Sequence, residues 1–109
     1  MVNSNLKGKT GERDWVAFLK KNQLYSRRTQ QYCGKTDESA DCIGLKGIHQ
    51  EVKRVERLNI AKAMSQSITD SKDKKLMPIV AHRISRGPWL VTMTAEDWIN
   101  IYKEWIENG

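Results

Sequence analysis

The sequence predicts an α/β fold with the order helix, three strands, helix, two strands and a last helix. Apolar residues recur at helical spacing in three segments, and short apolar segments typical of strands lie between them. Turns that contain glycine, proline and small polar residues separate the segments. The 109 residues fit one domain, 1–109, without an internal repeat or a low-complexity linker.

The first helix is expected at 10–22. Thr10 can act as its N-cap, and Trp15, Phe18 and Leu19 follow at i, i+3 and i+4 spacing. This spacing places the three apolar side chains on one face of the helix.

Three short strands are expected next, at 24–30, 40–45 and 48–54. The turn-rich residues 33–39 separate the first two strands. Gly44 and Gly47 bracket the turn that leads into the third strand.

A second helix is expected from 59 to about 75, because Ile60, Ala63 and Ile68 lie on one helical face. Pro78 marks the break after it. Two further strands, at 79–84 and 89–92, flank a turn at 85–88 that contains Gly87 and Pro88.

The last helix follows Thr94, which together with Asp97 resembles a capping box with Asp in place of Glu or Gln. An apolar stripe at i, i+3, i+4 and i+7 consists of Trp98, Ile101, Tyr102 and Trp105. Such a face is expected to be core or a subunit interface, rather than a platform for stacking on bases, because its surround is acidic.

The chain is basic, with 19 Lys and Arg against 13 Asp and Glu, a net charge of +6 and a pI near 9.5. This balance favours a polyanionic partner, although charge alone leaves nucleic acid, acidic lipid and mere solubility open. Residues 1–36 carry most of the excess positive charge, whereas the residues from Thr94 onward are acidic.

There is no apolar run of the ~20 residues that a membrane span needs and no signal peptide, so a cytoplasmic protein is expected. In that compartment Cys33 and Cys42 are expected to be free thiols.

The expected strand 48–54 carries Glu51 and Lys53 on one face, because side chains two apart on a strand share a face. A hairpin from Asp41 to Glu51 adds a second carboxylate to that face. Two carboxylates that bind a hard divalent cation, beside a lysine that stabilises charge on a phosphate, form a minimal site for phosphodiester cleavage.

The element order, with Asp41 in segment 39–45, Glu51-x-Lys53 in segment 50–54 and the basic segment 7–13, resembles the PD-(D/E)XK nuclease superfamily. Within it, the small archaeal and phage Holliday-junction resolvases look most similar. Ala40 stands where the family name has proline. The resemblance covers nearly the whole chain and implies a restriction-endonuclease-like core of helix, β-meander, helix and returning strands.

The resemblance implies a Mg²⁺-dependent endonuclease, with Mn²⁺ able to substitute, that cuts four-way or branched DNA as a homodimer. Asp41, Glu51, the Val52 carbonyl and Glu12 would hold the metal. Lys53 would position the water or stabilise charge, and the polar side chain of Gln66 would reach the site. The phosphate-binding set comprises Lys7, Lys9, Arg13, Arg27, Arg28, Lys35 and Arg54. Trp98, Tyr102 and Trp105 are the candidate core or dimer contacts.

Other interpretations of the residues stay open or are rejected. A nicking or restriction-like endonuclease acting on duplex DNA and a non-catalytic basic nucleic-acid-binding module are the alternatives. His49 and His82 are interpreted as packing or rim residues. Nucleotide triphosphate binding is rejected, because Thr29 and Asn3 stand where a phosphate-binding loop before Lys35 or Lys9 requires glycine.

Overall fold

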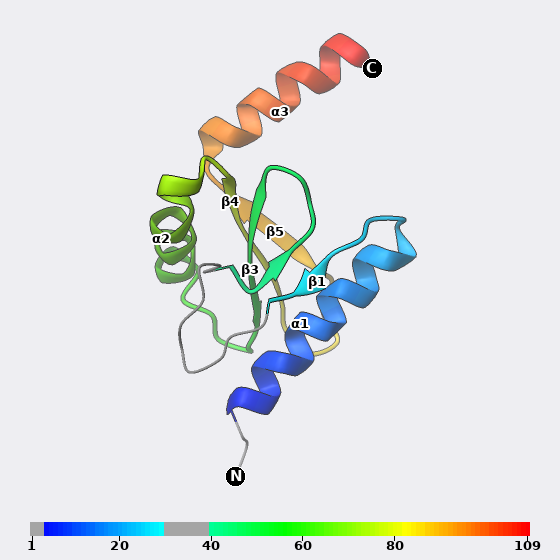
Figure 1. Ribbon diagram of the computed structural model, residues 1–109, viewed down its shortest axis with the longest axis vertical. Helices are drawn as coiled ribbons and strands as arrows, with labels where there is room; N and C mark the ends of the chain where they lie inside the picture. Colours follow the sequence, from blue (N-terminus) through cyan, green and yellow to red (C-terminus); the bar gives the residue numbers. More distant parts are fainter. Residues whose placement is uncertain (1–3, 30–39) are drawn as a thin grey trace.

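The computed structural model describes residues 4–29 and 40–109, with side chains described from Thr10 onward. Within these residues the predicted order of elements is confirmed (Figure 1). The elements are α1 (Ser4–Lys21), β1 (Arg27–Arg28), β2 (Cys42–Ile43), β3 (Ile48–Arg54), α2 (Ile60–Ser71), the 3-10 turn η1 (Lys72–Lys74), β4 (Met77–Arg83), β5 (Leu90–Met93) and α3 (Ala95–Asn108).

One mixed sheet organises the molecule, with the strand order β1-β2-β3-β4-β5. The pairs β1–β2, β2–β3 and β4–β5 are antiparallel, and the central pair β3–β4 is parallel. A parallel pair needs a crossover connection, which α2 supplies. β2 and β3 therefore form the predicted hairpin, which brings the segment of Asp41 beside that of Glu51.

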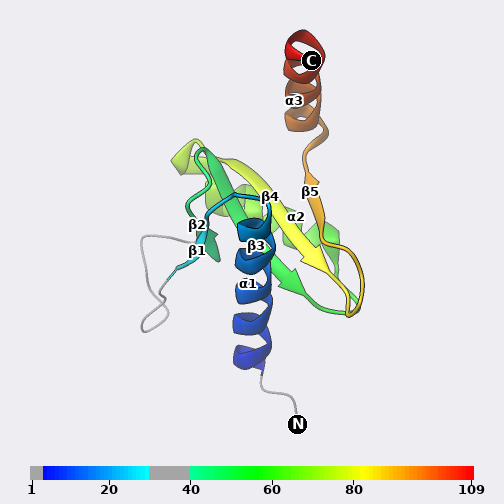
Figure 2. The ribbon, with the colours of Figure 1, turned by 90° about the vertical axis from the view of Figure 1, so that its right-hand side faces the viewer.

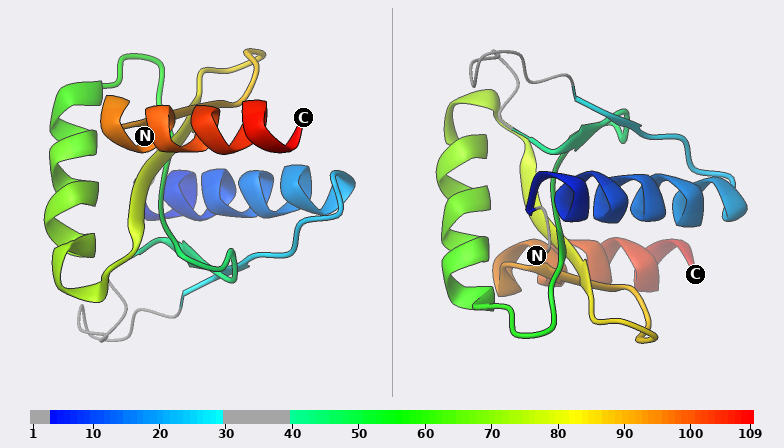
Figure 3. Two further views of the ribbon diagram at one scale, coloured as in Figure 1. Left: turned by 90° about the horizontal axis from the view of Figure 1, so that it is seen from above. Right: turned by 90° about the horizontal axis from the view of Figure 1, so that it is seen from below.

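The two faces of the sheet are covered by different helices, as Figures 2 and 3 show. On one face, Trp15 and Leu19 of α1 form a buried cluster with Cys42, Val52 and Ala81. α2 packs on the opposite face over β3 and β4. Val52 packs against α1. Because side chains alternate along a strand, Glu51 and Lys53 on β3 face α2.

Several predicted boundaries are wrong. α1 begins at Ser4 rather than at Thr10, and the strands expected at 24–30 and 40–45 are reduced to the two-residue strands β1 and β2. At β2 the ladder stays short because Gly44 has a φ of 117°, a conformation that ends the extended backbone. The predicted turn at 33–39 and Cys33 lie outside the described residues.

The second helix ends earlier than expected, and Pro78 does not mark the break. The chain leaves η1 at Lys75, which has the left-handed φ of 55°, and β4 already begins at Met77. Pro78 pairs with His49 of β3 in register, whereas pairing with β5 starts only at Ile79. A proline is tolerated there because it lies near the start of β4, where no residue of β5 pairs with it.

The apolar stripe of α3 was expected to be core or a subunit interface, and the structure rules out the core. The helix has the predicted N-cap, with the Asp97 N–H donating to Thr94 Oγ1 at 3.1 Å, but it has no buried residue. It projects beyond the end of the sheet (Figure 1). β5 ends where the sheet ends, and only Thr94 separates the strand from the helix, so α3 continues away from the core.

Candidate functional site

Asp41 is held between β1 and β3 by backbone and side-chain hydrogen bonds. The Asp41 N–H donates to the Gln50 carbonyl at 2.9 Å, and the Thr29 N–H donates to the Asp41 carbonyl at 3.1 Å. The Val52 N–H donates to Asp41 Oδ2 at 2.9 Å. The carboxylate is thus fixed against β3, and Val52 contacts it through its N–H; a role for the Val52 carbonyl stays a prediction.

The electrostatic environment of Asp41 includes three other predicted site residues: Glu51, Glu12 and Lys53. The pKa of Asp41 is raised to about 7, first by burial, then by the charge of Glu51 and, to a smaller extent, by the charge of Glu12. The Val52 N–H and the charge of Lys53 lower it. Asp41 therefore keeps its proton up to a pH much closer to neutrality than an exposed carboxyl group does.

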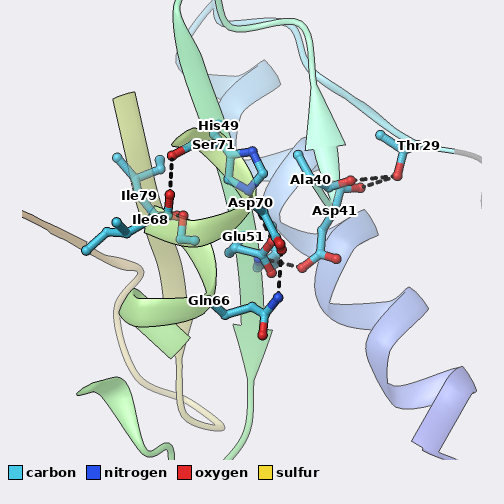
Figure 4. Close-up of polar contacts among 12 residues, drawn as sticks. Thr29, Ala40, Asp41, His49, Glu51, Gln66, Ile68, Asp70, Ser71 and Ile79 are labelled. Atoms are coloured by element: carbon cyan, nitrogen blue, oxygen red, sulfur yellow. Dashed lines mark hydrogen bonds and ion pairs between the residues drawn. The ribbon is translucent and has the colours of Figure 1, made fainter. Parts of the chain in front are cut away.

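Glu51 lies on the α2 face of β3 and is almost completely buried, with 4% of its surface exposed. Its Oε1 lies 3.2 Å from Nε2 of His49, which is completely buried. Asp70 of α2 completes a group in which the three donor atoms lie within 4.8 Å of one another. Figure 4 shows these side chains converging between β3 and α2.

Gln66 reaches this group through Asp70. The Gln66 Nε2 donates to Asp70 Oδ2 at 2.9 Å, along the i, i+4 row of α2 that faces β3. Ser67 anchors the same helix, because its Oγ donates to the Ile79 carbonyl of β4 at 3.0 Å. The structure therefore places Gln66 at the site as a residue that orients Asp70.

Glu12 of α1 is near the site but already has a strong partner. Arg28 Nε donates to Glu12 Oε1 at 2.8 Å, and both side chains are partly buried. The charge of Glu12 contributes to the raised pKa of Asp41. To bind a metal ion as predicted, the Glu12 carboxylate would have to give up its ion pair with Arg28.

A cleft of about 300 Å³ lies beside Lys53, between the end of β3 and the first turns of α2. Val55, Leu58 and Ala63 line it with apolar surface, and Lys53 and Lys62 line it with positive charge. The cleft places a second lysine close to Lys53, at a position where a phosphate and an apolar group could both be accommodated.

The predicted phosphate-binding residues whose side chains are described divide into an exposed pair and a pair that contacts carboxylates. Arg13 and Arg27 are exposed. Arg28 is paired with Glu12, and Arg54 Nε lies 3.6 Å from Asp14 Oδ2. The remaining members have no described side chain: Lys7, Lys9 and Lys35.

Sequence reasoning missed His49, Asp70 and Lys62 as neighbours of the site. His49 was interpreted as a packing residue, and it is indeed buried. Its contact with Glu51 was missed, although residues two apart on a strand share a face. Asp70 stands four residues after Gln66, a spacing that signals a shared helical face. Nothing in the sequence alone places Lys62 beside Lys53.

The donor set fits a divalent cation. Carboxylates suit Mg²⁺ and Mn²⁺, and an imidazole shifts the preference toward Mn²⁺ and other transition metals. His49, Glu51 and Asp70 form one group, and Asp41 lies to the right of this group in Figure 4. A cation bound to Glu51 would relieve the repulsion that raises the pKa of Asp41.

No protein-family model, curated protein or solved structure matches this chain. Among the described residues, no helix has the length and apolar character that crossing a membrane requires.

Proposed function

We propose that this protein is a metal-dependent endonuclease that hydrolyses phosphodiester bonds in DNA, with the restriction-endonuclease-like core of the PD-(D/E)XK superfamily. The observation that carries the proposal is the pair of carboxyl groups on the β2–β3 hairpin: Glu51 is buried in β3, and the partly buried Asp41 directly precedes β2, with Lys53 near both. Carboxylates buried together without equivalent positive charge are costly unless protons or a cation neutralise them.

Asp41 and Glu51 would hold the cation, with His49 and Asp70 as further donors and Glu12 as a donor only after it leaves Arg28. A divalent cation supplies charge that polarises a phosphate and lowers the pKa of a water. Lys53 directs its ammonium group to the phosphate oxygens and stabilises the charge that develops on them. The Val52 N–H keeps the Asp41 carboxylate in one orientation through the reaction.

The substrate is DNA, bound through its backbone. Arg13 and Arg27 contact phosphates beside the cut, and the cleft at Lys53 and Lys62 receives the strand next to it. The shape of the DNA, rather than its base sequence, decides the target. Branched DNA, such as a four-way junction, is the favoured substrate, and ordinary duplex is the alternative.

The test is cleavage of a labelled four-way junction, a matched linear duplex and single-stranded DNA, with Mg²⁺, Mn²⁺ or EDTA. We expect nicks on the junction that EDTA abolishes. Glu51→Gln should reduce the cleavage rate at least 100-fold, because it removes the charge that neutralises the cation. Binding to the junction in EDTA should remain, because the phosphate contacts do not involve Glu51.

Asp73→Asn is the matched control, since Asp73 is an exposed carboxylate in η1, outside the site. It should cleave like the wild type. Binding without cleavage in every metal would instead favour a non-catalytic nucleic-acid-binding module. Equal cutting of junction and duplex would retain the nuclease and reject the preference for branched DNA.

A further inference from the structure

α3 is an amphipathic helix that lacks a partner among the described residues. It packs against none of the described helices or strands to the extent that α1 and α2 pack on the sheet. The exposed fractions of its large apolar side chains range from 42% to 67%. They are Trp98, Ile99, Ile101, Tyr102, Trp105 and Ile106. Trp98 and Tyr102 stack at 5.5 Å, and Tyr102 lies 5.9 Å from Trp105, which gives one continuous aromatic row.

Local forces alone do not account for this helix. An isolated helix of about 12–15 residues is marginally stable in water even when it is rich in alanine. α3 has 14 residues and contains isoleucine, tryptophan and asparagine, which are weaker helix formers. The stability of α3 must therefore come from burial of its apolar face against another surface.

A second apolar surface lies open on the α1 side of the sheet. Phe18 of α1 is 40% exposed, and its ring lies 6.3 Å from that of Trp89. Val91 of β5 is opposite Ala81, a core residue on the α1 side, so Val91 points to the same side and is 47% exposed. We call Phe18, Trp89 and Val91 the Trp89 patch.

The α3 of one chain does not reach the Trp89 patch of the same chain. The patch lies at the beginning of β5, and α3 begins after the end of β5. Only Thr94, with an extended ψ of 149°, connects the strand to the helix. Reversal of direction between a strand and a helix usually needs a loop of about 2–6 residues. The connection therefore directs α3 away from its own sheet.

We infer that α3 docks on the Trp89 patch of a second copy of this chain, in a two-fold pair that exchanges the two helices. Charge complementarity favours this partner. α3 carries four carboxylates against one lysine, whereas Lys20 and Lys21 end α1 beside Phe18, and the Arg83 guanidinium lies 5.6 Å from the centre of the Trp89 ring. The same four carboxylates oppose docking on DNA or on an acidic membrane.

The area is sufficient for a stable dimer. The exposed parts of the six apolar side chains amount to roughly 600 Å² per chain, from the areas typical of these residue types. A stable interface buries about 800 Å² per partner. Each chain of a two-fold pair contributes one α3 and one Trp89 patch, so the two reciprocal contacts together reach this size.

The test is the mass of the full chain in solution, measured by sedimentation equilibrium without DNA or metal. We expect two chains at micromolar concentration. Trp105→Glu on α3 and Val91→Glu on the patch should each weaken dimerisation at least tenfold, because each buries a charge in an apolar contact. Ile68→Glu is the matched control, since Ile68 is equally exposed on α2 but outside both surfaces, and it should remain dimeric.

A charge exchange separates this arrangement from a contact between two α3 helices. Glu104→Lys with Glu107→Lys, or Lys20→Glu with Lys21→Glu, should weaken the dimer, and the four changes together should restore it. A monomeric wild type would overturn the inference, as would a dimer that Val91→Glu or both charge reversals leave intact. None of these outcomes bears on cleavage, so the nuclease proposal stands or falls separately.

Discussion

At the scale of single residues, Asp41 is the group on which the candidate site depends. It is bound to the Val52 N–H, close to Glu51, and shielded from water, and burial is the largest cause of its raised pKa. Cys42, the next residue, faces the core, where burial raises the pKa of its thiol to about 12. Asp41, directly before β2, and Cys42, its first residue, thus differ in chemistry: the carboxyl group lies at the candidate site, and the buried thiol is inert.

The raised pKa of Asp41 predicts a pH-dependent effect of Asp41→Asn. Between pH 3.8 and about 7, the unfolded state ionises while the folded state keeps its proton, so the free energy of unfolding of the wild type falls as pH rises. Asn keeps an acceptor for the Val52 N–H and cannot ionise. The variant should therefore raise the Tm at pH 8 and change it little at pH 4.

Thermal unfolding at both pH values measures this effect, with Asp73→Asn as the control that should show no difference. Mn²⁺ should raise the Tm of the wild type more than that of the variant at pH 8, because only the wild type offers the Asp41 carboxylate beside His49, Glu51 and Asp70. A Tm increase of equal size at pH 4 and pH 8 would show that ionisation of Asp41 is not the cause.

At the scale of elements, the β2–β3 hairpin positions both principal carboxylates. Its turn contains Gly44 and Gly47, both with positive φ. At Gly44 an added Cβ would lie 2.9 Å from the Tyr25 carbonyl and 3.1 Å from the Ser26 Cα, whereas at Gly47 no atom lies within 4 Å. The first glycine is therefore required by both backbone conformation and space, and the second by conformation only.

This difference predicts unequal effects of two identical substitutions. Gly44→Ala should lower the free energy of unfolding by about 2–3 kcal/mol, from the left-handed φ and the backbone contact together. Gly47→Ala should cost about 1–2 kcal/mol, because only the conformational cost applies. Urea unfolding of the two variants measures the difference, and equal losses would contradict the role of the Tyr25 contact.

At the scale of the whole molecule, positive and negative charges lie in different places. Residues 1–36 hold eight of the 19 Lys and Arg but only two of the 13 Asp and Glu, and α3 projects an acidic and apolar surface beyond the end of the sheet. DNA would contact the first region, and α3 would contact another copy. The long dimension of the molecule, 50 Å against 33 and 27 Å, reflects this projecting helix.

The exposure of the arginines predicts how DNA binding responds to salt. Arg27→Ala should weaken binding to all sequences alike and reduce the slope of log K against log salt by about 0.9, which is the loss of one phosphate contact. Arg28→Ala should change the slope less, because Arg28 is engaged by Glu12. Fluorescence anisotropy in EDTA, at several salt concentrations, measures both slopes. An unchanged slope for Arg27→Ala would exclude it from phosphate contact.

The sequence by itself determined the order of the elements, the hairpin that joins Asp41 and Glu51, and the buried face of α1. These features depend on side chains three or four positions apart on a helix or two apart on a strand, and such spacings are local. The cap at Thr94 was predictable for the same reason. The resemblance to nucleases used the same local motifs and stays a prediction.

Only the tertiary structure decided which distant residues meet. Asp70 joins His49 and Glu51 because the crossover places α2 against β3, and Glu12 binds Arg28 because α1 passes beside β1. The stripe of α3 is exposed because a single residue connects it to the end of the sheet. A periodic apolar pattern predicts that one face of a helix is buried. Which surface covers that face depends on where the fold places the helix.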